Sequence, residues 1–349
     1  MIQVNEVGSR FILDSEATTP MQTFIDKEKY DTSHLEGNIA GLFKINGQLN
    51  SMPFNTSNPI LFYNKDLFKA AGLDPEKPPT TYEELTTVAQ QLSKTGATGL
   101  GVFYKGWYME QNFPRQTALY VNNDNGRSGT PTESYLNKEA GVKTLTWWKS
   151  LVDNKLAINF GRSGDDAKKS FLSRQVAMMI NSTGGLRGVV DGAAGKFAVG
   201  TGFLPKPAGT TEGGVVIGGG SNWILNNKSE AEQQAAWEFI KYLVSPKVQA
   251  FWSVSSGYFP ITKTAYDEQS VKDNLVKYPQ FVTGIEQLHQ TKSTPATQGA
   301  VMGIFHEQRQ FVSTAIEEAL NGKKSPQEAL DTAADNSTKA LIKYNQANK

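Results

Sequence analysis

Apolar residues recur at helical spacing over much of the chain. Behind Thr81 and Glu84, which have the spacing of a capping box, apolar side chains follow at intervals of three to four residues up to Leu92. An apolar stripe over 142–152 predicts a second helix, and serine starts at 229, 245 and 325 predict three more. A helix-rich fold is therefore expected.

Shorter apolar runs lie between these helices. They predict strands at 2–7, 60–63, 175–180, 197–204 and 223–225. Strands that alternate with helices indicate an α/β architecture. The polar segment 122–132, rich in Asn, Gly and Ser, is interpreted as a surface loop.

Composition narrows the class of protein. A length of 349 residues predicts about two domains. The absence of cysteine excludes a disulfide scaffold, a thiolate zinc site and a cysteine nucleophile. With 35 basic and 34 acidic residues, the net charge of +1 argues against bulk nucleic-acid binding. The first residues lack the basic and apolar regions of a signal peptide, which leaves a cytoplasmic protein and a mature or truncated secreted protein both open.

Catalytic signatures are missing from the sequence. It contains no GxSxG, HExxH or GxxxxGK[ST] motif, and no GxGxxG after a strand. His34, His289 and His306 have no neighbour at metal-ligand spacing. No catalytic residue, metal site or cofactor is predicted.

The sequence has binding features instead. Three aromatic rings crowd around Gly106, a pattern typical of a sugar or polyol cleft and equally of a buried core. The glycines at 218–220 would let a backbone N–H approach an anion. Ser57 and Ser182 each follow a strand-like run, where a hydroxyl can contact a ligand or cap a helix.

Several longer stretches resemble one known family, the family 1 extracellular solute-binding proteins of ABC importers. The stretches that carry this resemblance are Asn64–Pro75, Pro78–Tyr82, Tyr242–Pro246 and Ser256–Ile261. Within the family, the members that bind glycerol-3-phosphate are most similar, at Pro53–Pro59, Gly106–Phe113, Ile217–Trp223 and Gly322–Ala333.

The resemblance implies a two-lobed, periplasmic-binding-protein-like α/β fold of type II, in the sugar-binding subgroup, with hinge crossings. Residues 1–56 and 219–264 would form lobe 1, and residues 57–218 and 265–349 would form lobe 2. The family has one small βαβ unit before the position of Ile2, so lobe 1 is expected to be incomplete at its N-terminus. Exposed sheet edges and apolar helix faces should follow, with lost stability or association.

The resemblance also implies a set of ligand-binding residues. The carboxylate of Glu6 would accept hydrogen bonds from glycerol hydroxyls, and Arg309 would pair with the phosphate, which suits a guanidinium fork. From the residues alone, both are equally typical of surface positions. The other implied contacts are hydroxyls of Ser57, Ser182 and Tyr258, the backbone of Gly219, and an aromatic platform of Trp107 and Tyr104, where the family usually has a second tryptophan.

The implied function is that of the substrate-binding subunit of an ABC importer. It would capture glycerol-3-phosphate or a glycerophosphodiester such as glycerophosphocholine between two closing lobes, and deliver it to the transmembrane permease subunits. No catalysis, cofactor, metal or nucleic acid is implied, and the location would be periplasmic or extracellular, free or lipoprotein-anchored.

Three alternatives stay open. An oligosaccharide or polyol binder of the same family would not need Arg309. A truncated remnant would bind nothing. An enzyme acting on glycerophosphodiesters would need clustered metal ligands or a nucleophile–base pair, and the sequence shows neither.

Overall fold

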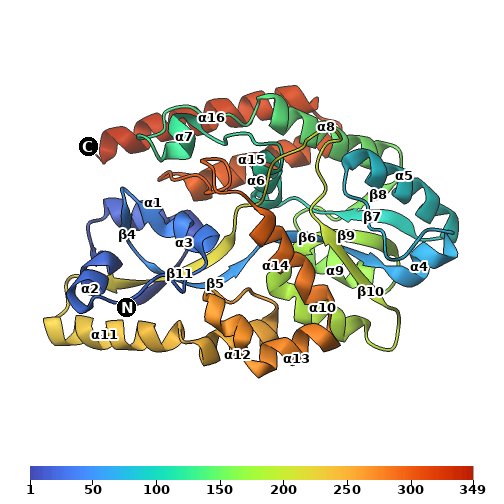
Figure 1. The fold of residues 1–349 in the computed structure, drawn as a ribbon. Coiled ribbons are helices and arrows are strands. Elements are labelled where there is room, and N and C mark those ends of the chain that lie inside the picture. The colour runs from blue at the N-terminus through green and yellow to red at the C-terminus, as the bar shows by residue number, and fades with distance from the viewer. Residues whose placement is uncertain (349) are drawn as a thin grey trace.

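The computed structural model describes residues 1–348, which form two main sheets with helices packed around them. Figure 1 shows the first sheet on the left and the second on the right. In the first sheet, one long central strand pairs antiparallel with three others. These are the central β11 (Gly218–Leu225) and its partners β1 (Ile2–Asn5), β2 (Thr18–Thr19) and β5 (Met52–Ser57).

The core beside the first sheet is built by helices whose apolar faces turn inward. Met21, Ile39 and Trp237 are completely buried there. A capping box between Ser229 and Glu232 begins the longest of these helices, as the sequence predicts. The elements of this region are α1 (Ser9–Asp14), α2 (Met21–Glu28), α3 (Gly37–Phe43), the hairpin β3 (Lys44–Ile45) and β4 (Gln48–Leu49), α11 (Glu230–Leu243) and α12 (Pro246–Ser256).

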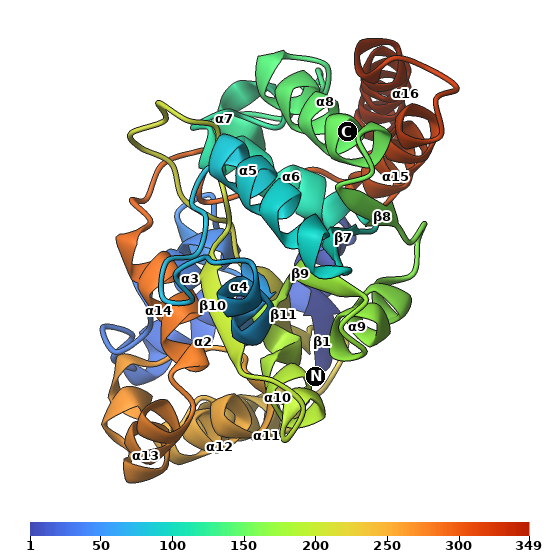
Figure 2. The ribbon, with the colours of Figure 1, turned by 90° about the vertical axis from the view of Figure 1, so that its right-hand side faces the viewer.

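The second sheet has the strand order β10-β6-β9-β7-β8. Its strand β6 alternates strictly: Ile60 and Phe62 enter the apolar cluster on one face, whereas Leu61 and Tyr63 enter the cluster on the other. Figure 2 shows α5 and α8 on one side of this sheet and α9 and α10 on the other. The strands are β6 (Pro59–Asn64), β7 (Thr98–Val102), β8 (Ala157–Asn159), β9 (Val176–Ser182) and β10 (Val199–Phe203).

Helices complete this half of the molecule; α15 and α16 pack against each other and against α8, and α15 also packs against α6. The helices are α4 (Lys65–Ala70), α5 (Tyr82–Leu92), α6 (Gly106–Arg115), α7 (Asn122–Gly126), α8 (Glu139–Asp153), α9 (Gly164–Leu172), α10 (Leu186–Ala193), α13 (Gln269–Lys277), α14 (Gln280–Gln290), α15 (Phe305–Leu320) and α16 (Pro326–Ala347). Four 3-10 turns are η1 (Glu6–Gly8), η2 (Ser93–Thr95), η3 (Thr183–Gly185) and η4 (Lys263–Asp267).

The chain passes between the two sheets at Asn58 and again through the segment 204–217. Asn58 is fully buried, and its side-chain amide donates to the carbonyl of Gly284 in α14 at 3.1 Å. The backbone carbonyl of Asn58 accepts from Thr183 at 3.0 Å. These bonds tie the crossing to both neighbouring elements.

The predicted helices that begin at Thr81, Ser229, Ser245 and Ser325 are all present, as is the one over 142–152. Of the predicted strands, the first is shorter because the chain turns at Glu6, and the last is longer because all three glycines at 218–220 join β11. Strands β5, β7 and β8 were not predicted. Strands β5 and β7 contain Pro53, Asn55 or glycines, which weaken a strand signal, and β8 has only three residues.

The interpretation of 122–132 as a surface loop is wrong for its first half. Asn123, Asp124 and Asn125 all have left-handed backbone angles and form one turn. Asn125 is buried, and its side-chain oxygen accepts from the backbone of Tyr120 and Val121 at 2.6 and 3.1 Å. Asparagine tolerates this conformation and hydrogen-bonds locally, so polar composition here marks a specific turn.

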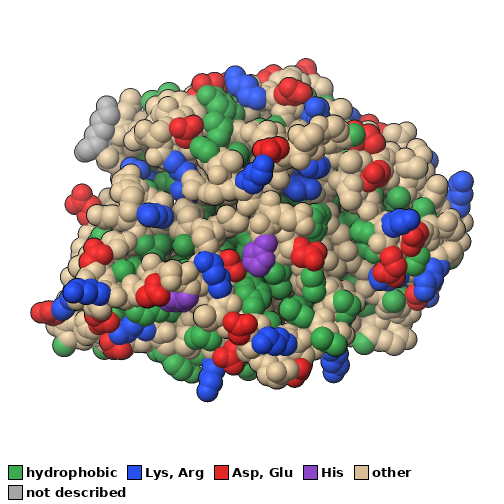
Figure 3. All heavy atoms as spheres, viewed as in Figure 1, with side chains coloured by type: hydrophobic (Ala, Val, Ile, Leu, Met, Phe, Trp, Pro, Cys, Tyr) green, Lys and Arg blue, Asp and Glu red, His purple; other side chains and the backbone are tan. Residues whose placement is uncertain are grey.

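Among residues 1–348, no helix combines the length and apolar character needed to cross a membrane. Lys and Arg side chains are interspersed with Asp and Glu over the face in Figure 3, in keeping with the near-zero net charge.

Candidate functional site

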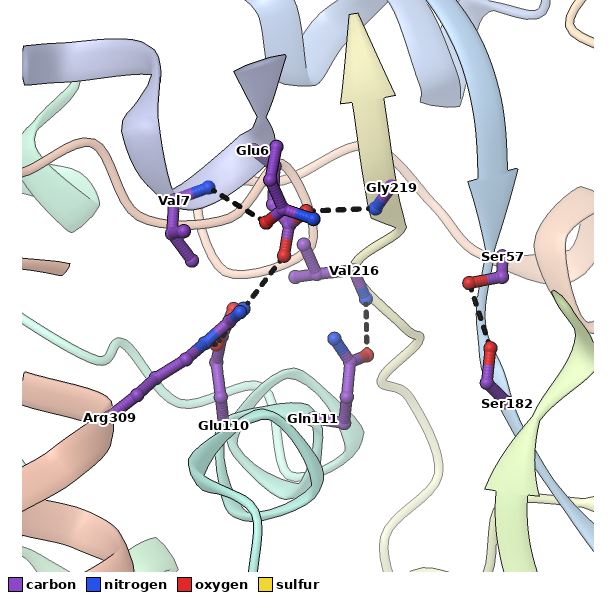
Figure 4. A network of polar contacts seen from close by, with 10 residues as sticks. Glu6, Val7, Ser57, Glu110, Gln111, Ser182, Val216, Gly219 and Arg309 are labelled. Carbon is purple, nitrogen blue, oxygen red and sulfur yellow. Dashed lines mark hydrogen bonds and ion pairs between the residues drawn. The ribbon is translucent and has the colours of Figure 1, made fainter. Parts of the chain in front are cut away.

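An arginine and two carboxylates from three distant elements form a buried cluster (Figure 4). The Nη2 atom of Arg309, in α15, lies 2.9 Å from Oε1 of Glu6 and 2.8 Å from Oε2 of Glu110. Its Nε atom donates to the same oxygen of Glu110 at 3.1 Å. Glu6 lies in the turn that follows β1, and Glu110 lies in α6. We call these three residues the triad.

Burial shapes the electrostatics of the triad. The side chains of Glu6 and Glu110 are only 7% and 5% exposed, and that of Arg309 is 17% exposed. Burial raises the pKa of Glu110 to about 7; the charge of Arg309 opposes this rise and that of Glu6 adds to it. Burial alone would lower the pKa of Arg309, but the two carboxylates raise it. The triad therefore carries one net negative charge, or none once Glu110 is protonated.

Gly219 fixes the carboxylate of Glu6 from the other side. Its backbone N–H donates to Oε2 of Glu6 at 2.9 Å. Gly219 is a strand residue with a φ of +141°, and a Cβ there would lie 1.8 Å from the carbonyl oxygen of Asn55. Only glycine fits this position, and its N–H is directed at a protein carboxylate.

Trp107 adjoins the triad through α6 and packs against β11. A Cβ on Gly218 would lie 2.9 Å from the indole ring, so the two surfaces are in close contact. The ring is half-buried, and its Nε1 donor has no hydrogen-bond partner among the described residues. The indole thus has a partly exposed ring and an unused N–H that is itself buried against Gly218.

Ser57 and Ser182 meet where the two sheets approach each other (Figure 4). Their hydroxyl oxygens are 3.0 Å apart. Ser182 also accepts from the backbone N–H of Gly184 at 3.1 Å and caps the following 3-10 turn, so the structure shows the capping role, and ligand contact stays a prediction. The ring of Tyr258 lies against Gly184 and stacks on Trp252, with 6.4 Å between ring centroids.

Tyr104 lies apart from these groups. It follows β7, its backbone N–H donates to Gly161 at 2.8 Å, and its side chain is buried in the core of the second sheet. The structure therefore brings together Glu6, Gly219 and Arg309, pairs Ser57 with Ser182, and buries Tyr104 in a core cluster against which Trp107 packs. The aromatic platform stays a prediction.

An open cavity of about 690 Å³ lies at the carboxyl ends of β7 and β9. Tyr108 and Asn181 line it, directly next in sequence to Trp107 and Ser182, and the phenol of Tyr108 donates to Oδ1 of Asn181 at 2.9 Å. Lys105 lies in its wall as well. In α/β proteins ligands bind beyond the carboxyl ends of strands, which makes this cavity the natural extension of the site.

Sequence reasoning missed the role of Glu110. The residue was part of a recognised motif, but no contact was assigned to it. A carboxylate three residues after Trp107, on a helix that is otherwise buried and uncharged until its last residue, is the signal that could have found it. Trp252, which packs on Tyr258, was also missed. Among the described residues, no group of three side chains could hold a metal ion.

Comparison with known proteins supplies the family. The family model of the bacterial extracellular solute-binding proteins matches residues 8–281. The sn-glycerol-3-phosphate-binding periplasmic protein UgpB of Escherichia coli K12 is 31% identical over 357 residues, covering 100% of this chain and 81% of UgpB.

Two solved structures establish the fold. UgpB from Mycobacterium tuberculosis, in complex with glycerophosphocholine, has a TM-score of 0.80 at 19% identity and covers 98% of this chain and 83% of its own. The sugar-binding protein MalE from Xanthomonas citri has a TM-score of 0.80 at 18% identity, covering 99% and 84%. The predicted two-lobed α/β fold is confirmed. The chain binds solutes rather than catalysing a reaction, and it belongs to the bacterial extracellular solute-binding protein family.

Proposed function

We propose that this chain is the solute-binding subunit of an ABC importer and that it captures glycerol-3-phosphate or a glycerophosphodiester such as glycerophosphocholine. The observation that carries the proposal is the triad, in which a carboxylate and a guanidinium lie side by side between the two sheets. The 31% identity to UgpB of Escherichia coli supports it. The location would be the periplasm or the cell exterior, either free or as a lipoprotein.

Each group of the site has a proposed role. Carboxylate oxygens have several lone pairs, so Glu6 can still accept from glycerol hydroxyls while it holds Arg309 and Gly219. Arg309 uses Nε and Nη2 on the carboxylates, which leaves the Nη1 amino group for a phosphate oxygen. The indole of Trp107 would donate Nε1–H once the lobes rearrange, because this atom is buried against Gly218 in the present arrangement. Ser57, Ser182 and Tyr258 would supply hydroxyls.

The solute would close the two lobes by stabilising the closed state of the protein over the open state. We assign residues 1–56 and 219–264 to one lobe and 57–218 and 265–349 to the other. Because Glu6 and Gly219 belong to the first of these lobes and Ser182 and Arg309 to the second, a solute that contacts all four stabilises the closed form. The permease subunits of the importer would recognise that form.

A second candidate solute is a neutral polyol or saccharide, and the charge of the triad favours it. Two carboxylates against one arginine leave a net negative charge, which repels a phosphate at high pH. Protonation of Glu110 removes this repulsion. A phosphate ester should therefore bind more tightly as the pH falls through about 7, whereas a neutral solute should not respond.

Isothermal titration calorimetry separates the candidates. We would titrate glycerophosphocholine, glycerol-3-phosphate, maltose and ribitol into the wild type and into Glu110→Gln, which keeps the shape of the side chain and removes its charge. Tight binding of the phosphate ligands, strengthened in Glu110→Gln at pH 8, is the expected result. Binding of maltose or ribitol alone would replace the proposal by the saccharide alternative, and binding of none would leave the non-binding remnant.

A further inference from the structure

A second cavity, of about 480 Å³, lies where two connecting segments run between the sheets. Its wall includes the end of α6, the end of α14, the crossing segment 204–217 and the segment 291–304 that leads into α15. None of the residues assigned to the solute site lines it. We call it the hinge cavity.

A buried arginine without a counter-ion lines the hinge cavity. Arg115, the last residue of α6, is only 6% exposed. Its Nε atom has no hydrogen-bond partner among the described residues. Burial lowers its pKa to about 10, and the only group that acts in the opposite direction is the phenol of Tyr82, not a carboxylate. Unpaired buried charges are costly and rare in folded proteins, so this one calls for a reason.

A second cation lies beside Arg115. Burial, and then the positive charge of Arg115, lower the pKa of Lys206, which shows that the two charges repel each other. The Nζ atom of Lys206 reaches a carbonyl, that of Thr211, at 3.5 Å. Lys292 also lines the cavity, but it is already paired with Glu212 at 2.7 Å. The wall therefore carries two positive charges that no carboxylate of the described residues balances.

We infer that the hinge cavity binds a small tetrahedral oxyanion, such as phosphate or sulfate, between Arg115 and Lys206. A planar guanidinium, a lysine ammonium and nearby hydroxyl and amide groups, here Thr211 and Gln290, form a donor set that suits such an anion. The bound anion would offset the repulsion between the positive charges of Arg115 and Lys206.

Because of the position of the cavity, a bound anion would affect the arrangement of the two lobes. It would contact the end of α6 and the crossing segment 204–217 at the same time. A ligand that fixes this crossing segment against α6 favours one arrangement of the lobes, so the anion would be coupled to solute binding by linkage. This inference does not depend on which solute the cleft binds.

Thermal unfolding with added anion tests the inference. Millimolar sodium phosphate or sodium sulfate would be compared with sodium chloride at equal ionic strength, for the wild type, Arg115→Met and Lys206→Met. Lys94→Met, at an exposed lysine away from the cavity, is the matched control. Trp107→Ala reports on anion binding in the solute cleft instead.

Phosphate should raise the unfolding temperature of the wild type, Lys94→Met and Trp107→Ala by a few degrees, that of Lys206→Met by less, and that of Arg115→Met not at all. In chloride, Arg115→Met should unfold at the same or a higher temperature than the wild type, because it removes an unpaired buried charge. If Arg115→Met does not fold, the phosphate-induced rise in unfolding temperature is compared between Lys206→Met and Lys94→Met, and a smaller rise in Lys206→Met supports the inference.

Three outcomes would overturn the inference. An equal phosphate effect in Arg115→Met and the wild type would mean a general salt effect. Loss of the effect in Trp107→Ala but not in Arg115→Met would place the anion in the solute cleft. Absence of any phosphate effect in the wild type would mean that the cavity binds no such anion.

Discussion

Arg309 donates a hydrogen bond of 2.9 Å to Glu6, a residue 303 positions earlier in the chain. The bond joins the first strand region to a helix near the C-terminus, so it can form only once both halves of the molecule are folded. It also places opposite charges side by side in a buried site, which is what a solute with hydroxyls and an acidic group would require.

The pH dependence of the free energy of unfolding should reveal the raised pKa of Glu110. Its pKa is raised from an ordinary value of 4.5 to about 7, so the folded protein holds this proton more tightly than the unfolded chain does. The resulting stabilisation is complete below pH about 4.5 and is lost as the pH rises through about 7. The free energy of unfolding of the wild type minus that of Glu110→Gln should therefore fall across this window, as measured by urea denaturation. A difference that rises with pH would contradict the raised pKa.

Binding of glycerophosphocholine should follow the same titration. A phosphodiester does not change its charge between pH 5 and 8, so any pH dependence reports the protein. We expect affinity to rise as the pH falls through about 7 in the wild type and to stay level in Glu110→Gln, measured by calorimetry. Equal pH profiles of affinity in the two proteins would show that Glu110 does not cause the pH dependence.

Replacement of Gly219 by alanine should disrupt the site. The added Cβ would lie 1.8 Å from a backbone oxygen, in a region of φ that alanine avoids, so β5 and β11 must separate. We expect a loss of more than about 3 kcal/mol in the free energy of unfolding. Gly322→Ala is the control, because its φ is also positive and nothing lies within 4 Å; it should cost about 1 kcal/mol. Similar losses in both variants would argue against the clash.

Trp107→Phe should separate solute binding from folding. It keeps a ring against Gly218 and removes an N–H that no protein group uses. Loss of one hydrogen bond to the solute would weaken affinity roughly fivefold, at about 1 kcal/mol, with little change in stability. Trp237→Phe is the control, because this tryptophan is buried in the core beside the first sheet. That variant should lose stability and keep its affinity; an unchanged affinity of Trp107→Phe would rule out the indole as a donor.

In the left-handed turn of α7, substitution by alanine should cost much more stability at Asn125 than at Asn123. Asn125→Ala removes the acceptor of two backbone N–H groups and a donor to Pro295, all in a buried setting, which should cost about 2 to 4 kcal/mol. Asn123 has the same backbone conformation but is exposed, so Asn123→Ala should cost about 1 kcal/mol. Chemical denaturation of both variants gives the comparison, and equal costs would mean that backbone conformation alone matters.

The sequence by itself determined the local structure. The capping box at Thr81 formed as predicted, and the helices predicted to begin at Ser229 and Ser325 also begin with capping boxes. The hydrogen bonds of a capping box join residues three apart and need no tertiary contact. The alternation in β6 follows equally from local geometry. Resemblance to a family, carried by short motifs, supplied the two-lobed fold and its class of function.

Only the tertiary structure determined which residues of the site contact one another. No pattern along the chain predicts that Glu110 lies against Arg309, that Gly219 donates to Glu6, or that Arg115 is buried without a counter-ion. Each of these depends on elements that are distant in sequence and on the removal of water around a charge. The pKa of a carboxylate and the cost of an unpaired guanidinium are set by that burial, which exists only in the folded chain.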